Sequence, residues 1–151
     1  MSYSQTVNPS TTDRERLRRS LKPIAAAVFV ISSALNVYGA HDYREVAAVT
    51  AVIVATMVGV YAFLLPRKLA QESAGGTALT LSLIGLAVLV PAFWSGLPLI
   101  LGAAGALLGY AGKNATSGSG KATAGFVIGL LAVLGYFAIY LLDTLRQFGI
   151  G

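Results

Sequence analysis

Three groups of residues have types and spacing suited to chemistry, and the first lies around the single histidine. His41 is followed by Asp42 and Glu45, and a histidine and a carboxylate four residues apart can bind one metal ion from a single helix turn. A third protein ligand is not evident, and no Ser or Tyr is placed as a nucleophile beside His41. We therefore interpret Asp42 and Glu45 as the N-cap and N3 residues of a helix, where negative charge favours the positive end of the helix dipole.

The second group is the loop at residues 118–123, Gly-Ser-Gly-Lys-Ala-Thr. It is similar to a phosphate-binding loop, whose glycines precede a Lys and then a Ser or Thr. The motif needs its first glycine where Ala115 stands and a hydroxyl where Ala122 stands, and no strand is predicted before it. We interpret the loop as a flexible cytoplasmic turn whose two lysines, Lys113 and Lys121, lie near lipid headgroups.

The third group consists of mild polar side chains within apolar runs: Ser32, Ser33, Asn36, Thr50, Thr56, Thr80 and Ser82. The runs contain no Asp, Glu, Lys, Arg or His, whereas proton relays and coupled transport in a bilayer depend on ionisable side chains. The sequence therefore disfavours a proton-coupled pump. Ser32 and Asn36 share a helix face, and we expect them to hydrogen-bond to a neighbouring helix. A pore lined by such hydroxyls is the alternative.

The amino-acid composition indicates the class of protein to which these residues belong. Hydrophobic residues make up 56% of the 151-residue chain and charged residues 11%, a mixture outside the range of soluble domains and typical of membrane proteins. Cysteine is absent, which excludes disulfides and thiolate metal sites. The net charge of +5 is concentrated at the ends of apolar runs and does not indicate a nucleic-acid partner. We expect no cofactor and no enzyme activity.

Five apolar runs predict an all-α membrane protein with five transmembrane helices in an antiparallel up-down bundle. Each run approaches the roughly 20 residues that cross a hydrocarbon core of about 30 Å, and backbone groups in lipid must pair within their own segment, as in a helix. The predicted spans are residues 24–40, 46–65, 77–94, 97–112 and 122–142. Pro66 is expected to stop the second span, and Pro91 to kink the third.

The basic residues predict the orientation. With the N-terminus in the cytoplasm, nine of the eleven Lys and Arg residues lie on the inner side, and only Arg44 and Arg146 lie outside, which follows the positive-inside rule. Residues 1–23 are then a polar, basic cytoplasmic tail, and residues 143–151 are a short external tail. The predicted location is the cell inner (plasma) membrane.

Two alternatives change the number of crossings. Arg18 and Arg19, the apolar run and the segment 32–34, Ser-Ser-Ala, are also compatible with a cleavable signal peptide. The connection 95–98, Ser-Gly-Leu-Pro, is so tight that the third and fourth spans could form a re-entrant hairpin. Both readings stay open at this point.

Small residues recur every four positions on three of the predicted spans. Such faces let two helix backbones approach closely in a membrane. The predicted helix-packing residues are Ala47, Ala51, Ala55 and Gly59 in the second span, Gly105 and Gly109 in the fourth, and Gly125 and Gly129 in the fifth. We expect them to pack mainly within the chain; a homodimer surface is the alternative.

A basic segment precedes the first span. Thr12 and Glu15 fit a capping box, which predicts a short helix starting near Asp13. The residues predicted to face lipid headgroups are Arg14, Arg16, Arg18, Arg19 and Lys22. Each such cation near an anionic leaflet contributes on the order of 1 kcal/mol. A plain topology signal explains the same charges without specific lipid binding.

The C-terminal hairpin has a pattern of small residues that is also found in other proteins. Residues 99–109 form a glycine- and alanine-rich run, a basic Gly/Ser loop follows, and Ala122, Ala124, Gly125 and Gly129 open the last helix. This hairpin resembles that of small multi-span membrane proteins of bacterial, actinobacterial type whose function is unknown. The resemblance implies a fold and a location but no activity.

The predicted function is that of a structural or accessory subunit, a scaffold that acts through helix packing. Its expected partners are membrane lipids and either a larger membrane protein complex or further copies of the chain. A small oligomeric channel or transporter is the alternative, and a lipid-binding regulator acting through residues 13–22 is a third hypothesis.

Overall fold

The computed structural model describes residues 9–39, 42–71 and 74–149, and this part of the chain is helical without strands. Its elements in order are α1 (Pro9–Gly39), α2 (Tyr43–Met57), the π-helical segment η1 (Val58–Leu64), α3 (Leu65–Leu69), α4 (Gly75–Ala87), the 3₁₀ turn η2 (Phe93–Ser95), α5 (Leu97–Gly112) and α6 (Ser119–Gln147). Because α2, η1 and α3 follow one another without a break, we refer to them together as the second long helix.

Among the described residues, three helices are long and apolar enough to cross a membrane. They are residues 14–38 within α1, the second long helix, and α6. The other two are shorter, with 13 residues in α4 and 16 in α5. At 1.5 Å per residue these helices are about 20 Å and about 24 Å long, less than a hydrocarbon core of about 30 Å.

Two prolines behave differently from the prediction. The second long helix does not stop at Pro66 but continues to Leu69. Proline removes a backbone donor and its ring crowds the preceding turn, but here the wider π turn comes first, and the Leu65 N–H donates to the Val60 carbonyl five residues back. Pro91 does not kink a helix either, because α4 ends at Ala87 and Pro91 lies in the following turns.

The helix start predicted at Asp13 is also wrong. α1 begins at Pro9, a residue type that suits the first turn of a helix because its missing N–H would be unpaired there. Thr12 therefore lies inside the helix and not at its N-cap. The predicted polar tail and first span are one continuous helix, which passes through Pro23.

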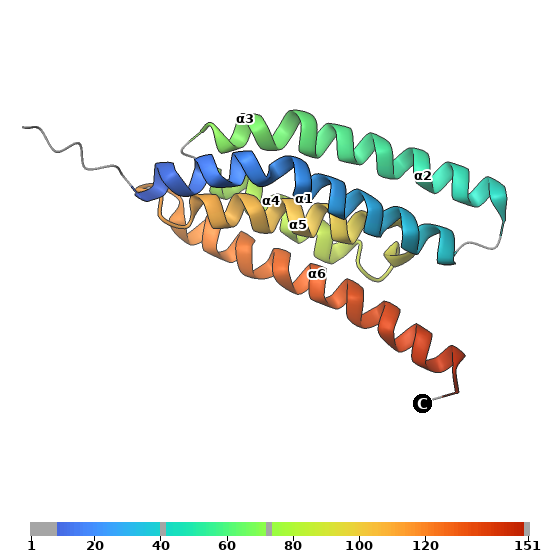
Figure 1. Cartoon of the computed structure of the whole chain (residues 1–151). Helices are drawn as coiled ribbons and strands as arrows, with labels where there is room; N and C mark the ends of the chain where they lie inside the picture. Colours follow the sequence, from blue (N-terminus) through green and yellow to red (C-terminus); the bar gives the residue numbers. More distant parts are fainter. Residues whose placement is uncertain (1–8, 40–41, 72–73, 150–151) are drawn as a thin grey trace, which may run out of the picture.

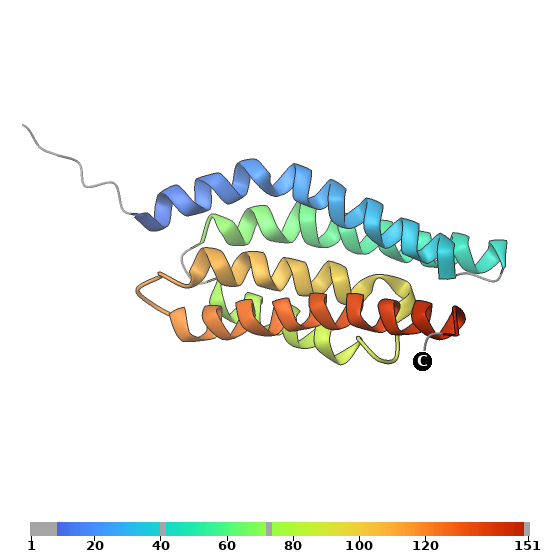
Figure 2. The same cartoon turned by 60° about the horizontal axis from the view of Figure 1, so that its bottom comes forward.

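The core lies around α5. α4, α5 and α6 make the most extensive contacts with one another, while α1 contacts both α5 and α2. Both views show α5 between two groups of helices: α1 and the second long helix lie on one side of α5, and α6 lies on the other side (Figures 1 and 2). Leu99, Ile100, Ala104 and Leu108 of α5 are buried, so α5 is the helix that joins the two halves of the molecule.

Candidate functional site

The histidine group does not form a site in the part of the chain that is described. His41 lies outside the described residues. Asp42 occupies the N-cap position of α2 in an extended conformation, but its side chain makes no capping hydrogen bond. Glu45 lies in the first turn of α2. Within residues 9–39, 42–71 and 74–149, no three His, Cys, Asp or Glu side chains lie close enough to hold a metal ion.

The loop after α5 is a helix connection. Gly118 adopts the left-handed conformation, with a φ of 77°, and α6 starts at the next residue. Lys121 therefore lies in the first turn of α6. The Lys113 ammonium lies over the Tyr110 ring, 3.8 Å from its centroid, a cation–π contact that holds this lysine against α5.

Two of the polar side chains in the apolar helices, Asn36 and Ser82, join one helix to another. The Asn36 amide of α1 donates to the Thr50 hydroxyl of α2 at 3.2 Å and to the Val46 carbonyl at 3.4 Å. The Ser82 hydroxyl of α4 donates to the Gly125 carbonyl of α6 at 2.6 Å. Both side chains are buried, so these two groups serve interhelical hydrogen bonding. The Ser32 hydroxyl is buried as well but has no hydrogen-bond partner among the described residues, so the bond expected from Ser32 to a neighbouring helix is wrong.

The predicted small-residue faces divide into two sets. Gly105, Gly109, Gly125 and Gly129 are buried among α4, α5 and α6. A methyl group at Gly125 would lie 2.8 Å from the Ala78 carbonyl carbon, and one at Gly129 would lie 2.6 Å from the Gly102 carbonyl oxygen. Each distance is far below the usual contact distance of about 3.5–4.0 Å between carbon atoms, so helix backbones meet at these glycines.

The other set lies on the second long helix and is turned outward. Its four members, Ala47, Ala51, Ala55 and Gly59, are exposed. No atom lies within 4 Å of the position that a methyl group on Gly59 would occupy. The spacing that packs helices inside the chain is therefore repeated on its surface without an internal partner.

The basic residues of α1 have different surroundings. The Arg14 Nε donates to the Ala111 carbonyl at 3.4 Å, in the last turn of α5, where a cation also interacts favourably with the helix dipole. This contact differs from the predicted headgroup-facing role of Arg14. The other four members of the set, Arg16, Arg18, Arg19 and Lys22, are exposed.

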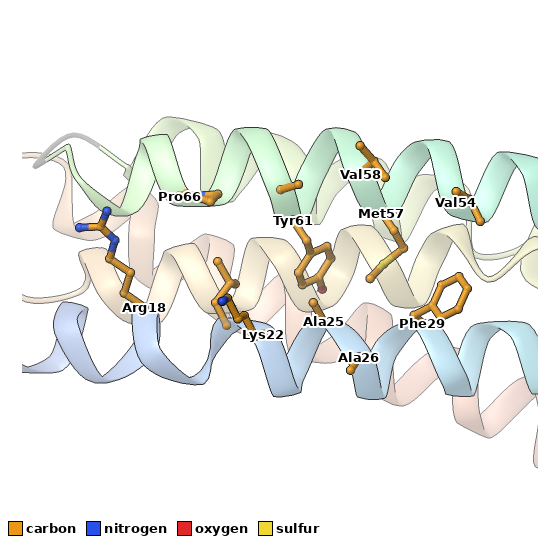
Figure 3. Close-up of a pocket in the computed structure, with 12 residues that line it drawn as sticks. Arg18, Lys22, Ala25, Ala26, Phe29, Val54, Met57, Val58, Tyr61 and Pro66 are labelled. Carbon is orange, nitrogen blue, oxygen red and sulfur yellow. The ribbon is translucent and has the colours of Figure 1, made fainter.

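A groove of about 660 Å³ runs between α1 and the second long helix (Figure 3). Its lining is apolar except at one end: Arg18, Leu21, Lys22, Ala25, Ala26, Phe29, Val54, Met57, Val58, Tyr61, Ala62 and Pro66. In Figure 3, Arg18 and Lys22 lie at the end near Pro66, and Phe29 lies at the end near Val54. The groove therefore has a basic end, at Arg18 and Lys22, and is apolar over the rest of its length.

The base of the groove is buried and is bonded to the core. The Met57 and Tyr61 side chains point from the second long helix toward α1 (Figure 3) and are buried. The Tyr61 hydroxyl donates to the Ile100 carbonyl of α5 at 3.3 Å. This bond attaches η1 to the core helix, and three residues of η1, Val58, Tyr61 and Ala62, line the groove. π turns of this kind recur at functional sites.

The groove was not predicted from the sequence, although one of its walls has a signal there. Arg18, Lys22, Ala25 and Phe29 are spaced by four, three and four residues, which places them on one face of α1. The opposite wall depends on the π turn, which no residue pattern in the chain indicates.

Comparisons of the chain with protein-family models, with curated proteins and with solved structures found no match. The resemblance of the C-terminal hairpin therefore stays a prediction, and the function has to be inferred from the geometry.

Proposed function

We propose that this chain is a small integral membrane protein that acts as an accessory subunit, docking the outward face of its second long helix against a transmembrane helix of another membrane protein. The observation that carries this proposal is the exposed face of Ala47, Ala51, Ala55 and Gly59. In a bilayer, association between helices depends on close packing at small residues because lipid tails are as apolar as leucine.

The exterior of the molecule supports membrane insertion. Large apolar side chains are exposed on each of the three long helices and on α4, including Val30 and Val37 of α1, Phe63 of the second long helix, Leu83 of α4 and Leu134 of α6. Soluble proteins rarely expose apolar surface over such an extent. A lipid environment removes the cost of this exposure.

The proposed topology retains five antiparallel helices with the N-terminus in the cytoplasm of an inner (plasma) membrane. The short helices α4 and α5 cross the bilayer with the help of the connection at residues 88–96. Phe93 and Trp94 in this connection form an edge-to-face pair with ring centroids 5.6 Å apart, and aromatic rings of this kind favour the membrane interface. A modest local thinning of the bilayer accommodates the remaining mismatch in length.

The internal glycines support docking by the outer face. The chain uses the same four-residue spacing at Gly125 and Gly129 to bring α6 against α4 and α5. Leucine at either internal glycine would disrupt the fold itself. Bulk added to the outer face, where Gly59 has no neighbour within 4 Å, would leave the fold intact and obstruct only an external partner.

The test is gentle-detergent purification of the tagged full-length protein from its own membranes, followed by protein mass spectrometry and native mass determination. We expect stoichiometric co-purification of a membrane protein. The double variant Ala51→Leu/Ala55→Leu should lose this partner, while the matched control Ala27→Leu/Ala138→Leu, which adds the same bulk at exposed positions of α1 and α6, should retain it.

Two results would contradict the proposal. One is a chain that purifies without a stoichiometric partner. The other is a homo-oligomer dissociated by Ala51→Leu/Ala55→Leu, which would assign the outer face to self-association.

A further inference from the structure

We infer that the groove between α1 and the second long helix binds one acyl chain of an anionic phospholipid, with the lipid phosphate held by Arg18 and Lys22. This inference is independent of the docking face, because the four small residues of that face are not among the groove lining. The occupant follows from the shape, the length and the charge of the groove.

The shape fits a flexible apolar chain. The floor is made by Leu21, Met57 and Tyr61, which are buried, and the rim by Phe29 and Val58, which are exposed. A rim of exposed apolar side chains opens the groove sideways, toward the lipid that surrounds a membrane helix. The volume of about 660 Å³ lies within the range of roughly 300–1,000 Å³ typical of small-molecule sites.

The length fits one leaflet. Arg18 and Phe29, at the two ends of the groove, are eleven residues apart on α1, which corresponds to about 17 Å at 1.5 Å per residue. Half of a hydrocarbon core of about 30 Å is about 15 Å. A chain anchored at Arg18 therefore reaches approximately the middle of the bilayer near Phe29.

The charge specifies the headgroup. Arg18 and Lys22 are separated by four residues and lie on the same side of α1 (Figure 3), so that both can contact one phosphate. Neither forms an ion pair with any acidic residue in the described part of the chain. The groove lining contains no acidic side chain, and this end of α1 is the end that precedes the apolar run, where phosphates of the leaflet lie.

The experiment compares lipid retention by native mass spectrometry. The full-length protein is exchanged into mixed micelles containing equal amounts of phosphatidylglycerol and phosphatidylcholine with identical acyl chains. We expect one retained lipid per chain, with phosphatidylglycerol in excess. Arg18→Gln/Lys22→Gln should lower the ratio of retained phosphatidylglycerol to phosphatidylcholine about 10- to 30-fold, as expected for the loss of two cations.

The control for charge is Arg16→Gln/Arg19→Gln. It removes the same charge from the same helix at exposed positions that do not line the groove, and it should leave the ratio unchanged. An equal fall in both double variants would overturn the inference, because it would assign retention to the general basic charge of α1. An unchanged ratio in Arg18→Gln/Lys22→Gln would overturn it as well.

A second pair of variants tests the apolar part. Ala26→Phe places a ring in the groove, whereas Ala27→Phe adds the same ring at an exposed position outside the groove lining. We expect Ala26→Phe to abolish retention of the lipid and Ala27→Phe to preserve it. Retention by Ala26→Phe at the level of the unmodified protein would exclude the groove as the site of the acyl chain.

Discussion

Replacing Gly129 with alanine adds one methyl group at the point where α4, α5 and α6 meet. The new carbon would lie 2.6 Å from the Gly102 carbonyl oxygen, 2.7 Å from the Ala106 nitrogen and 2.9 Å from the Ser82 hydroxyl oxygen. Two of these neighbours are backbone atoms of α5, which cannot rotate away as the end of a flexible side chain can. The substitution therefore forces α5 and α6 apart.

The expected cost follows from two opposing terms. Overpacking a close-packed interior costs about 1–3 kcal/mol, and the rigid backbone neighbours favour the upper part of that range. Alanine in place of glycine within a helix recovers up to about 1 kcal/mol. We expect Gly129→Ala to lower the free energy of unfolding by about 2 kcal/mol.

Gly120→Ala is the matched control. It makes the same change in the same helix, but no atom lies within 4 Å of the new carbon. Only the gain in helix propensity then acts, so that Gly120→Ala should leave the free energy of unfolding unchanged or raise it by less than about 1 kcal/mol. The two variants should differ by about 2–3 kcal/mol.

The measurement is equilibrium unfolding in mixed micelles with rising dodecyl sulfate. Far-ultraviolet circular dichroism reports helix content, and the fluorescence of the single tryptophan, Trp94, reports packing near η2. A Gly129→Ala protein as stable as Gly120→Ala would refute close backbone packing of α5 and α6 at this position.

Three further substitutions test individual hydrogen bonds. Tyr61→Phe removes the bond to the Ile100 carbonyl and should lower the free energy of unfolding by about 0.5–1.5 kcal/mol; a change below about 0.2 kcal/mol in the same unfolding assay would contradict this role. Asn36→Ala loses the bond to the Thr50 hydroxyl, and a double-mutant cycle with Thr50→Val should give a coupling energy of about 0.6 kcal/mol, whereas strict additivity would argue against the contact. Arg14→Gln weakens the attachment of α1 to the end of α5 and should destabilise the protein by about 0.5–1 kcal/mol, while Arg16→Gln should have no effect on thermal stability.

The helical class of the protein could be predicted because long apolar runs without charge leave the backbone no other way to pair in lipid. The shared face of Ser32 and Asn36 could also be predicted, since four-residue spacing defines one side of a helix, and both side chains are buried. Only Asn36 forms the predicted interhelical hydrogen bond, because the Ser32 hydroxyl has no partner among the described residues. These predictions depend only on residues close together in the chain.

The remaining features depend on distant neighbours. Periodicity indicates that Ala47 and Gly59 share a side of their helix, but it does not indicate whether that side faces the core or the exterior. The bond from Arg14 to Ala111 joins residues 97 positions apart, and no local pattern predicts it. Pro66 was expected to end a helix because the rule assumes α geometry, whereas a π turn precedes it.

The short lengths of α4 and α5 have a consequence for biogenesis. Both helices make their most extensive contacts with α6, which follows them in the chain. Until α6 emerges, Gly102 and Gly109 of α5 lack the α6 residues that they face, and neither short helix partitions into a bilayer as favourably as a span of full length. In the proposed membrane topology, α4 and α5 are therefore expected to integrate together with α6, once α6 has been synthesised, whereas α1 and the second long helix can integrate as they leave the translocation channel.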